Sequence, residues 1–377
     1  MIDPVVAALA WVHGFADPMV WLVLVTFLAG AVIERLADRS SEHTWLDDSV
    51  VRWSYLLAWI VFAVYWVTQI YYFAFQAKSI VEAPAVIAAV PLSVYIGIRL
   101  VRGRAGLQVL SRAVAFMWLF YMPFTSLAIF RQPLIELVTH HSEFVLGLLT
   151  QDFRVISGQT TDAGIRTAQT YTMNGTTLPA NLSIGAKHFP YRSTFLFVDG
   201  GHPLMYTVRI ACTGIGSMAV FVGLIAAVRA PIRRKLVASA SAVGIIYVLN
   251  IARNVFIAYT FGEQRLQVVP DVIMGLFGLS DPYLVSYYIS DRLISQILAI
   301  GILMGITWIV VRQVPEVLTV VEEGLAVLTG REYDLERVID SRRTTLDDPG
   351  DGASEDRSSA PDGTDDGASG DRSSAPD

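Results

Sequence analysis

Long apolar runs constrain this chain more than any other feature of its sequence. Residues 56–75, LLAWIVFAVYWVTQIYYFAF, contain no charged side chain, and residues 293–311, LISQILAIGILMGITWIVV, repeat the pattern near the other end. A helix needs about 20 apolar residues to cross the roughly 30 Å hydrocarbon core of a bilayer. Only 16% of the residues are charged, whereas soluble proteins carry about 25%. The chain is therefore predicted to cross a membrane several times.

The apolar runs predict an all-α polytopic membrane protein with about seven transmembrane helices. Breaks between the runs place these spans near residues 19–35, 51–75, 81–99, 106–130, 211–228, 236–261 and 284–311. The polar segment 151–208 separates the fourth span from the fifth. We therefore expect a transmembrane domain over 1–315, a cytoplasmic juxtamembrane segment over 316–343 and a separate tail over 344–377.

Basic residues in short loops predict the orientation, because cytoplasmic loops are enriched in Lys and Arg. The basic clusters are RLVRGR at 99–104, RAPIRRK at 229–235 and the segment after Arg312, and they share one side of a seven-span chain. The N-terminus and the long polar segment then face outward, and the tail is cytoplasmic. The sequons at Asn174 and Asn181 fall in this outer segment, where glycosylation is possible.

The tail is acidic and repetitive. DGASEDRSSAPD at 351–362 recurs at 366–377 with one change, and residues 344–377 contain ten acidic residues and two arginines. The tail thus has a net charge of −8, and because the whole chain has −6, the remainder has about +2. A segment with so few apolar residues cannot bury enough surface to fold. We expect a disordered, solvated tail without chemistry.

The cysteine content excludes several classes of site. Cys212 is the only cysteine, so an internal disulfide, a cysteine-based zinc cluster and a dithiol redox motif are all excluded. The sequence shows no metal-ligand pattern and no organic cofactor motif. We expect no metal, no cofactor and no nucleic-acid partner, and the oligomeric state stays open.

Two arginines inside predicted spans need an explanation, because a charge in a bilayer costs roughly 2.5–3.5 kcal/mol on insertion scales. Cys212, Arg253 and Arg292 lie 17, 18 and 20 residues from the basic residue at the cytoplasmic end of their own spans. At 1.5 Å per residue, their heights above that end are about 26, 27 and 30 Å. The sequence thus predicts a thiol and two guanidiniums at nearly one depth, close to the outer face.

These three groups suit nucleophilic catalysis. Neighbouring cations lower the pKa of a cysteine thiol and make thiolate available near neutral pH. Arginine stays protonated and cannot be a general base, but it can hold a thiolate or stabilise a tetrahedral oxyanion. A plainer interpretation stays open, since a lone cysteine is often apolar filler and arginines near span ends often reach headgroups. The small residues Thr213, Gly214, Gly216 and Ser217, which let backbones approach closely, favour the functional interpretation.

Three motifs in the last spans resemble those of a known family. ACTGIGS at 211–217, NIARNVFIAY at 250–259 and SDRLISQ at 290–296 are similar to the three motifs of the exosortase/archaeosortase membrane transpeptidases. The order Cys, Arg, Arg, with spacings of 41 and 39 residues, is similar to that of the archaeosortase A-like members. The multi-span layout extends the resemblance to roughly residues 1–315.

The resemblance implies a cysteine transpeptidase that acts like a sortase on secreted proteins. Its substrates, such as S-layer glycoprotein, would carry a C-terminal sorting tail with a Pro-Gly-Phe-type motif, a hydrophobic helix and basic residues. Cys212 would form a thioester near that motif, and a membrane phospholipid would then release the protein in lipid-anchored form. Arg253 would match the family's first arginine. Arg292 would occupy the proton-donor position of the third motif, where exosortases more often have histidine, and the 151–208 segment would cap the site.

Because the third motif lacks histidine, the general acid and base are unassigned. His188 and His202 in the outer segment are candidates that could reach the site. Ser217 and Asn254 are candidate hydrogen-bond donors behind the reacting groups. We expect Asp291 to pair elsewhere or to meet water, because on an α-helix it points about 100° away from the next residue.

Two further interpretations remain for the same residues. An intramembrane cysteine protease would use the same groups but release its product by hydrolysis. A non-enzymatic transporter or scaffold would use the arginines to bind an anionic lipid headgroup, and Cys212 would then be dispensable. The mass of the mature C-terminus separates the first from transpeptidation, and a Cys212→Ala change separates the second.

Overall fold

The computed structural model describes residues 4–39, 47–76, 82–104, 106–162, 164–185 and 189–331. The chain divides into two compact units, Met1–Tyr333 and Asp334–Asp377, and all of the described residues belong to the first. The predicted tail at 344–377 therefore lies outside the described residues, and its disorder stays a prediction.

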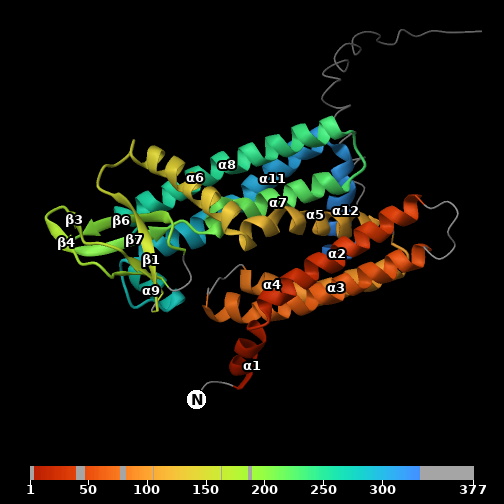
Figure 1. The fold of residues 1–377 in the computed structure, drawn as a ribbon, viewed down its shortest axis with the longest axis horizontal. Helices are drawn as coiled ribbons and strands as arrows, with labels where there is room; N and C mark the ends of the chain where they lie inside the picture. The colour runs from red at the N-terminus through yellow and green to blue at the C-terminus, as the bar shows by residue number, and fades with distance from the viewer. Residues whose placement is uncertain are drawn as a thin grey trace, which may run out of the picture. The chain divides into compact units, whose positions relative to one another are not determined.

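Helices make up most of the first unit (Figure 1). Its first half contains α1 (Pro4–His13), α2 (Ala16–Arg39), α3 (Asp48–Tyr71), the π-helical η1 (Tyr72–Gln76), α4 (Glu82–Val101), α5 (Gly106–Ser126) and α6 (Ala128–Leu146). Its second half contains the 3₁₀ turn η2 (Ile210–Thr213), α7 (Ile215–Ala227), α8 (Ile232–Gly262), α9 (Pro270–Phe277), α10 (Leu284–Tyr287), the π-helical η3 (Tyr288–Ile294), α11 (Ser295–Gln313), η4 (Pro315–Val317) and α12 (Leu318–Thr329).

Six helices in the described part are long and apolar enough to cross a membrane: Ala16–Arg39, Asp48–Gln76, Glu82–Val101, Gly106–Ser126, Ile232–Gly262 and Leu284–Gln313. Of the seven expected spans, 211–228 is the one that none of these six helices matches. There α7 has only 13 residues, about 20 Å at 1.5 Å per residue, which is shorter than the hydrocarbon core. The left-handed backbone of Gly214, with φ of 77°, separates α7 from η2. The expected fifth span, 211–228, is therefore interrupted just after Cys212.

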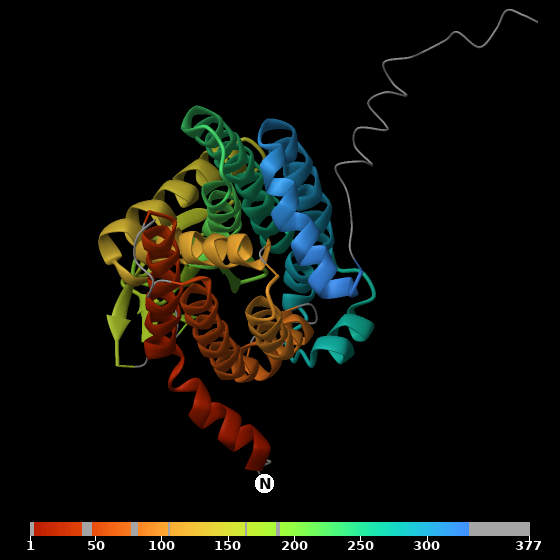
Figure 2. The ribbon, with the colours of Figure 1, turned by 90° about the vertical axis from the view of Figure 1, so that its right-hand side faces the viewer.

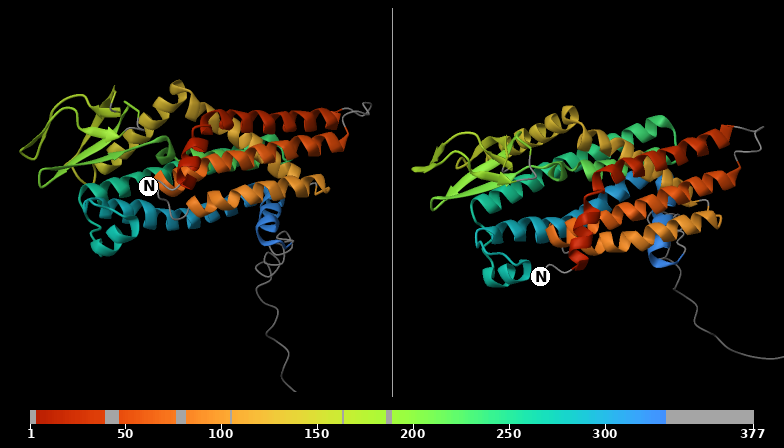
Figure 3. Two further views of the ribbon diagram at one scale, coloured as in Figure 1. Left: turned by 90° about the horizontal axis from the view of Figure 1, so that it is seen from below. Right: turned by 60° about the horizontal axis from the view of Figure 1, so that its bottom comes forward.

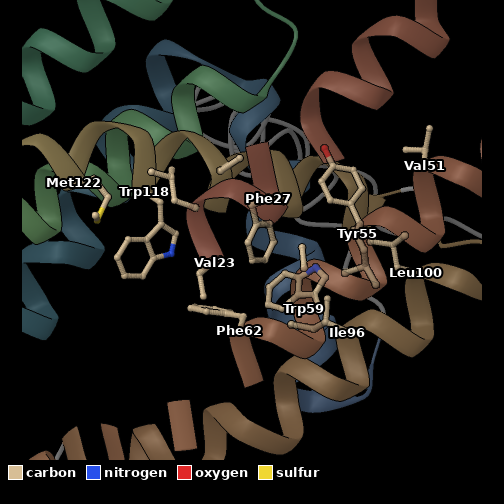
Figure 4. Close-up of a cluster of buried hydrophobic side chains, with 14 residues drawn as sticks. Val23, Phe27, Val51, Tyr55, Trp59, Phe62, Ile96, Leu100, Trp118 and Met122 are labelled. Atoms are coloured by element: carbon tan, nitrogen blue, oxygen red, sulfur yellow. The ribbon is translucent and has the colours of Figure 1, made fainter. Parts of the chain in front are cut away.

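The first four long helices share an aromatic core. Phe27 on α2 meets the ring of Trp59 on α3 edge-on, with centroids 5.3 Å apart, and meets Phe62 at 5.8 Å. Figure 4 shows these rings between the two helices. Gly30 lets α3 approach closely, because a Cβ at this position would lie 2.7 Å from the ring of Tyr55. This half of the chain is a packed scaffold.

The polar segment 151–208 folds into strands. It contains β1 (Arg154–Thr161), β2 (Gly164–Thr167), β3 (Tyr171–Met173), β4 (Thr176–Leu178), β5 (Ser183–Gly185), β6 (Arg192–Asp199) and β7 (His202–Thr207). The antiparallel sheet has the order β5-β2-β1-β6-β7, and β3 pairs with β4 in a separate hairpin. Asn174 and Gly175, with φ of 50° and 76°, form the left-handed pair that tight hairpins require. The chain is therefore mostly helical, and the expectation of an all-α fold missed this sheet.

The sheet packs on the ends of α6 and α8, at the end of the helix bundle opposite α12 (Figures 1 and 3). Phe195, Phe197 and Tyr206 share a buried cluster with Ile257 of α8. Gly262 lets the end of α8 pack closely against the sheet, because a Cβ at this position would lie 2.4 Å from the ring of Phe197. At the N-terminus, α1 leaves the side of the bundle (Figure 2). This docking places β7 beside α8, and residues of β7 and η3 line one cavity.

Candidate active site

Cys212 lies where the sheet gives way to the membrane helices. It belongs to η2, which follows β7 directly, and its free thiol is half-buried. Gly214 next to it adopts φ of 77°, which costs glycine little and other residues more. A Cβ on Gly214 would also lie 3.2–3.3 Å from Asn250 and Ile246. Both the backbone conformation and the close packing at position 214 therefore require glycine. This turn places the Cys212 thiol just before the start of α7.

Two asparagines of α8 fix the backbone of Cys212. The Nδ2 atoms of Asn250 and Asn254 donate hydrogen bonds to the Cys212 carbonyl, at 2.7 and 2.8 Å. The Tyr206 hydroxyl donates to Oδ1 of Asn254 at 2.7 Å. Burial raises the pKa of the Tyr206 hydroxyl well above its ordinary value, with a smaller contribution from the Cys212 thiol. Tyr206 therefore stays protonated and remains a donor over the working pH range.

A cavity of about 610 Å³, called the Cys212 cavity below, opens beside the thiol. Its wall combines β7, η2, α8 and η3 with residues of η1 at the other side. Three arginines, Arg209, Arg253 and Arg292, line it together with the carboxylates Asp291 and Glu82. The three residues that the sequence predicted at one depth, Cys212, Arg253 and Arg292, thus share one cavity.

Asp291 binds both predicted arginines. Nη2 of Arg253 donates to Oδ1 of Asp291 at 2.6 Å, and Nε of Arg292 lies 3.6 Å from Oδ2. Nη1 of Arg292 also lies 3.9 Å from a carboxylate oxygen of Glu82. Asp291 is buried, with 9% of its surface exposed, so one carboxylate holds two guanidiniums of two helices in the cavity.

This position of Asp291 differs from the expectation that it would pair elsewhere. The expectation assumed an α-helix, but residues 288–294 form the π-helix η3. A π-helix has more residues per turn and changes the direction of successive side chains. In the described residues, both π-helices contribute to the Cys212 cavity, since Tyr72 and Phe73 of η1 line its other side. Such segments are frequent at functional sites.

Arg209 was missed by the sequence analysis, although it lies only three residues before Cys212. The Cys212 amide donates to the Arg209 carbonyl at 2.8 Å, and this turn brings the guanidinium into the cavity. Burial opposes the charge of Arg209, but the nearby Cys212 thiol and Tyr287 hydroxyl raise the pKa of Arg209 above its ordinary value. Arg209 is thus a third permanent cation beside the thiol. The three-residue spacing in RIAC was the signal that could have found it.

The remaining predicted residues lie in different places. Asn254 contacts the carbonyl of Cys212, whereas Ser217 lines a neighbouring groove rather than the Cys212 cavity. His202 stacks on Tyr283, with ring centroids 4.4 Å apart, and lies 3.8 Å from Asp281. It is not among the residues that line the Cys212 cavity. His188 lies outside the described residues. Within the described ranges, no three His, Cys, Asp or Glu side chains gather as metal ligands would.

Known proteins match most of this chain. Residues 10–288 match the family model described as Transmembrane exosortase (Exosortase_EpsH). The chain is 41% identical over 330 residues to archaeosortase A of Haloferax volcanii, across 85% of this chain and 96% of that protein. It is 36% identical over 341 residues to archaeosortase A of Natronomonas pharaonis, across 89% and 96% of the two chains. No solved structure matches the chain.

Proposed function

Because this chain belongs to the exosortase family, we propose that it is a membrane-embedded cysteine transpeptidase that cleaves the C-terminal sorting tail of secreted surface proteins. As a member of this family similar to archaeosortase A, it is a membrane sorting enzyme for the C-terminal processing of other proteins. The observation that carries the finer proposal is the free thiol of Cys212 in one cavity with three arginines.

Cys212 is the nucleophile. Its sulfur attacks the carbonyl carbon of the scissile peptide, the C–N bond breaks, and the thiol proton ends on the leaving amine. The product of this step is a thioester on Cys212 and a released tail. Thiolates rather than thiols are the reactive species, and the cations Arg209 and Arg253 lie close enough to interact electrostatically with this sulfur.

The arginines stabilise charge during the reaction. The tetrahedral intermediate carries a negative oxygen, and donors fixed in advance are the usual means of stabilising it. Arg253 suits this role, because Asp291 fixes one end of its guanidinium and leaves other N–H groups for the substrate. Arg292 lines the same cavity beside Asp291, and we assign it to binding the substrate or the departing group.

Aromatic residues in the Cys212 cavity suit the sorting motif. Tyr72, Phe73 and Phe189 are among the residues that line the cavity, and a Pro-Gly-Phe-type motif offers a compact turn and one aromatic ring. The guanidinium of Arg131 lies 3.9 Å above the ring of Phe189, which fixes this part of the wall. The hydrophobic helix of the tail then lies in the membrane beside the enzyme.

The acceptor in the second step is a membrane phospholipid, and S-layer glycoprotein is a substrate of the type that this site would serve. The site faces the exterior, and the sheet of residues 151–208 covers it. The basic residues Arg99, Arg102, Arg229, Arg233 and Arg234 lie toward the other end of the helices, which supports this orientation by the positive-inside rule.

Trapping of the thioester tests this function. The purified full chain in lipid vesicles is mixed with a protein that ends in a Pro-Gly-Phe-type motif, a hydrophobic helix and basic residues. We expect a hydroxylamine-sensitive adduct on the peptide that contains Cys212, and none in Cys212→Ala. A mature C-terminus with lipid mass supports transpeptidation, whereas a free carboxylate shows hydrolysis. Unchanged processing by Cys212→Ala would contradict the proposal.

A further inference from the structure

A second hollow, called the α8–α11 groove below, lies beside the Cys212 cavity. It has a volume of about 450 Å³ and lies between α8 and α11, with residues of η2 and α7 also in its wall. Most of its lining is apolar, including Ile246 and Leu249 on α8, and Ala299, Leu303 and Ile306 on α11. A groove of this kind inside a membrane accepts hydrocarbon.

The length of the groove is that of one membrane leaflet. On α11 it runs from Ile294 to Ile306, twelve residues or about 18 Å at 1.5 Å per residue. On α8 it runs from Ile246 to Phe256, ten residues or about 15 Å. Half of a hydrocarbon core of roughly 30 Å is about 15 Å. On α8 the groove stops at Ile246, 14 residues short of the helix start at Ile232, and on α11 it stops at Ile306, seven residues before Gln313. The groove therefore runs along only part of either helix.

This length separates two occupants. A transmembrane helix of a substrate is about 30 Å long and about 10 Å wide, so it would need a surface along the whole of α8 and α11. A lipid chain reaches only to the centre of the bilayer. The length of the groove and its volume of about 450 Å³ therefore suit one lipid chain rather than a transmembrane helix.

The groove also contains polar side chains, and it adjoins the Cys212 cavity. Ser217, Asn250 and Ser295 line the groove. Arg253 and Gln296 line both the groove and the cavity. A lipid whose chain fills the groove thus places its headgroup beside Arg253, where an anionic phosphate meets a guanidinium, and its nucleophilic atom within the cavity that contains Cys212.

We propose that the α8–α11 groove binds one hydrocarbon chain of the acceptor phospholipid and delivers its headgroup to the thioester on Cys212. This inference rests on the proposed transpeptidase function. In the step itself, the nucleophilic atom of the headgroup forms a bond with the thioester carbon and the C–S bond breaks. The electron pair returns to the sulfur of Cys212, which takes the proton from the nucleophile. The protein product leaves with the lipid attached.

Filling the groove tests the proposal. Ala252 and Ala299 line the groove from opposite helices and do not line the Cys212 cavity. In vesicles of diphytanoyl phosphatidylethanolamine and diphytanoyl phosphatidylglycerol, Ala252→Trp and Ala299→Trp should lower formation of lipid-carrying product about tenfold or more. Release of the tail peptide in the first turnover should stay within about twofold. The thioester should therefore accumulate on Cys212.

Matched controls lie on the same two helices. Val248 on α8 and Ile300 on α11 are 65% and 56% exposed and line neither hollow. Val248→Trp and Ile300→Trp add the same ring to the membrane-facing surface, so both reactions should proceed as in the unsubstituted protein.

A second measurement reads binding without catalysis. A phosphatidylethanolamine with a diazirine in its acyl chain, incorporated in the same vesicles, should label peptides of α8 and α11 that line the groove. The two groove variants should lower that labelling about fivefold or more, and the two controls should not. If the unsubstituted protein forms no thioester, the proposed function fails while this labelling still tests the groove.

Two outcomes would overturn the inference. An equal fall of tail release and lipid transfer in both groove variants would place the substrate's helix in the groove. Unchanged lipid transfer together with unchanged labelling would show that the acceptor reaches Cys212 by another route.

Discussion

The two ends of the helix bundle both contain buried charge, and they differ in how that charge is balanced. At the end next to α12, Glu34 accepts hydrogen bonds from Arg112 at 2.8 Å and from Tyr55 at 2.7 Å. At the sheet end, three arginines line one cavity with two carboxylates and a thiol. A charged side chain that is already paired inside a membrane needs no other partner. A cation beside a cavity without a paired carboxylate is available to bind a substrate. The first end stabilises the fold, and the second is arranged for a substrate.

The largest expected effect is at the sheet end, where three arginines line one cavity with two carboxylates. Arg253→Ala should lower the rate of tail release about 10³-fold, about 4 kcal/mol in the barrier, because it removes a fixed donor to the oxyanion. It also leaves Asp291 without its 2.6 Å partner. The measurement is single-turnover release of the tail peptide by the purified protein in vesicles.

Arg234→Ala is the control for this change. Arg234 pairs with Glu316 near the other end, so tail release should stay close to that of the unsubstituted protein. A similar loss in both variants would show that arginine removal harms the fold in general and would remove the contrast between the two ends.

The next largest effect is a loss of stability at the end next to α12, where Glu34 and Arg112 form an ion pair. Glu34→Leu leaves Arg112 buried without its carboxylate, and breaking a buried ion pair costs about 3 kcal/mol or more. The side chains of Arg112 and Glu34 are only 16% and 9% exposed, so solvent compensates little. The melting temperature in detergent should fall clearly, while tail release per folded molecule should not change.

The double variant Glu34→Leu/Arg112→Leu sharpens this prediction. It removes both charges together, and apolar residues of similar volume often replace a buried pair without loss. Its melting temperature should recover much of the fall. A double variant as unstable as Glu34→Leu would mean that the pair itself, rather than an uncompensated arginine, carries the stability.

Counting residues along the helices predicted three of the residues that line the Cys212 cavity, but not Arg209 or Asp291. Helix rise is constant, so Cys212, Arg253 and Arg292 could be assigned one depth from the sequence, and they share one cavity in the structure. Rotation about the helix axis was harder to predict. The π-helix at 288–294 turned Asp291 toward Arg253, and a change from α to π geometry leaves no pattern in apolar periodicity.

The sheet was missed for a different reason. Residues 151–208 contain aromatic and β-branched residues typical of extended pieces, but strand pairing connects distant positions such as Arg154 with Leu196. Only the turn at Asn174 and Gly175 has a local signature. Composition alone therefore favours short extended pieces in this segment, whereas their order in a sheet beside α8 depends on packing.

Arg209 extends the comparison, because among the three arginines that line the Cys212 cavity it is the one that forms no ion pair within the described residues. Arg209→Gln should lower tail release about tenfold, about 1.4 kcal/mol, as expected for the loss of one charge-assisted contact. Arg209→Lys keeps the charge and should recover most of the rate. If the lysine variant is as slow as the glutamine variant, the shape of the guanidinium matters rather than its charge.

The smallest effect is expected for a pair that looks strong on distance alone. Arg234 donates two hydrogen bonds to Glu316, both at 3.1 Å, yet the two side chains are 43% and 36% exposed. Exposed pairs contribute about 1 kcal/mol or less, and salt screens them. Glu316→Gln should therefore shift the melting temperature in detergent only slightly, and less still in molar salt, with tail release unchanged. A fall as large as that of Glu34→Leu would show that burial does not distinguish the charges at this end, and the interpretation of Glu34 would then need another cause.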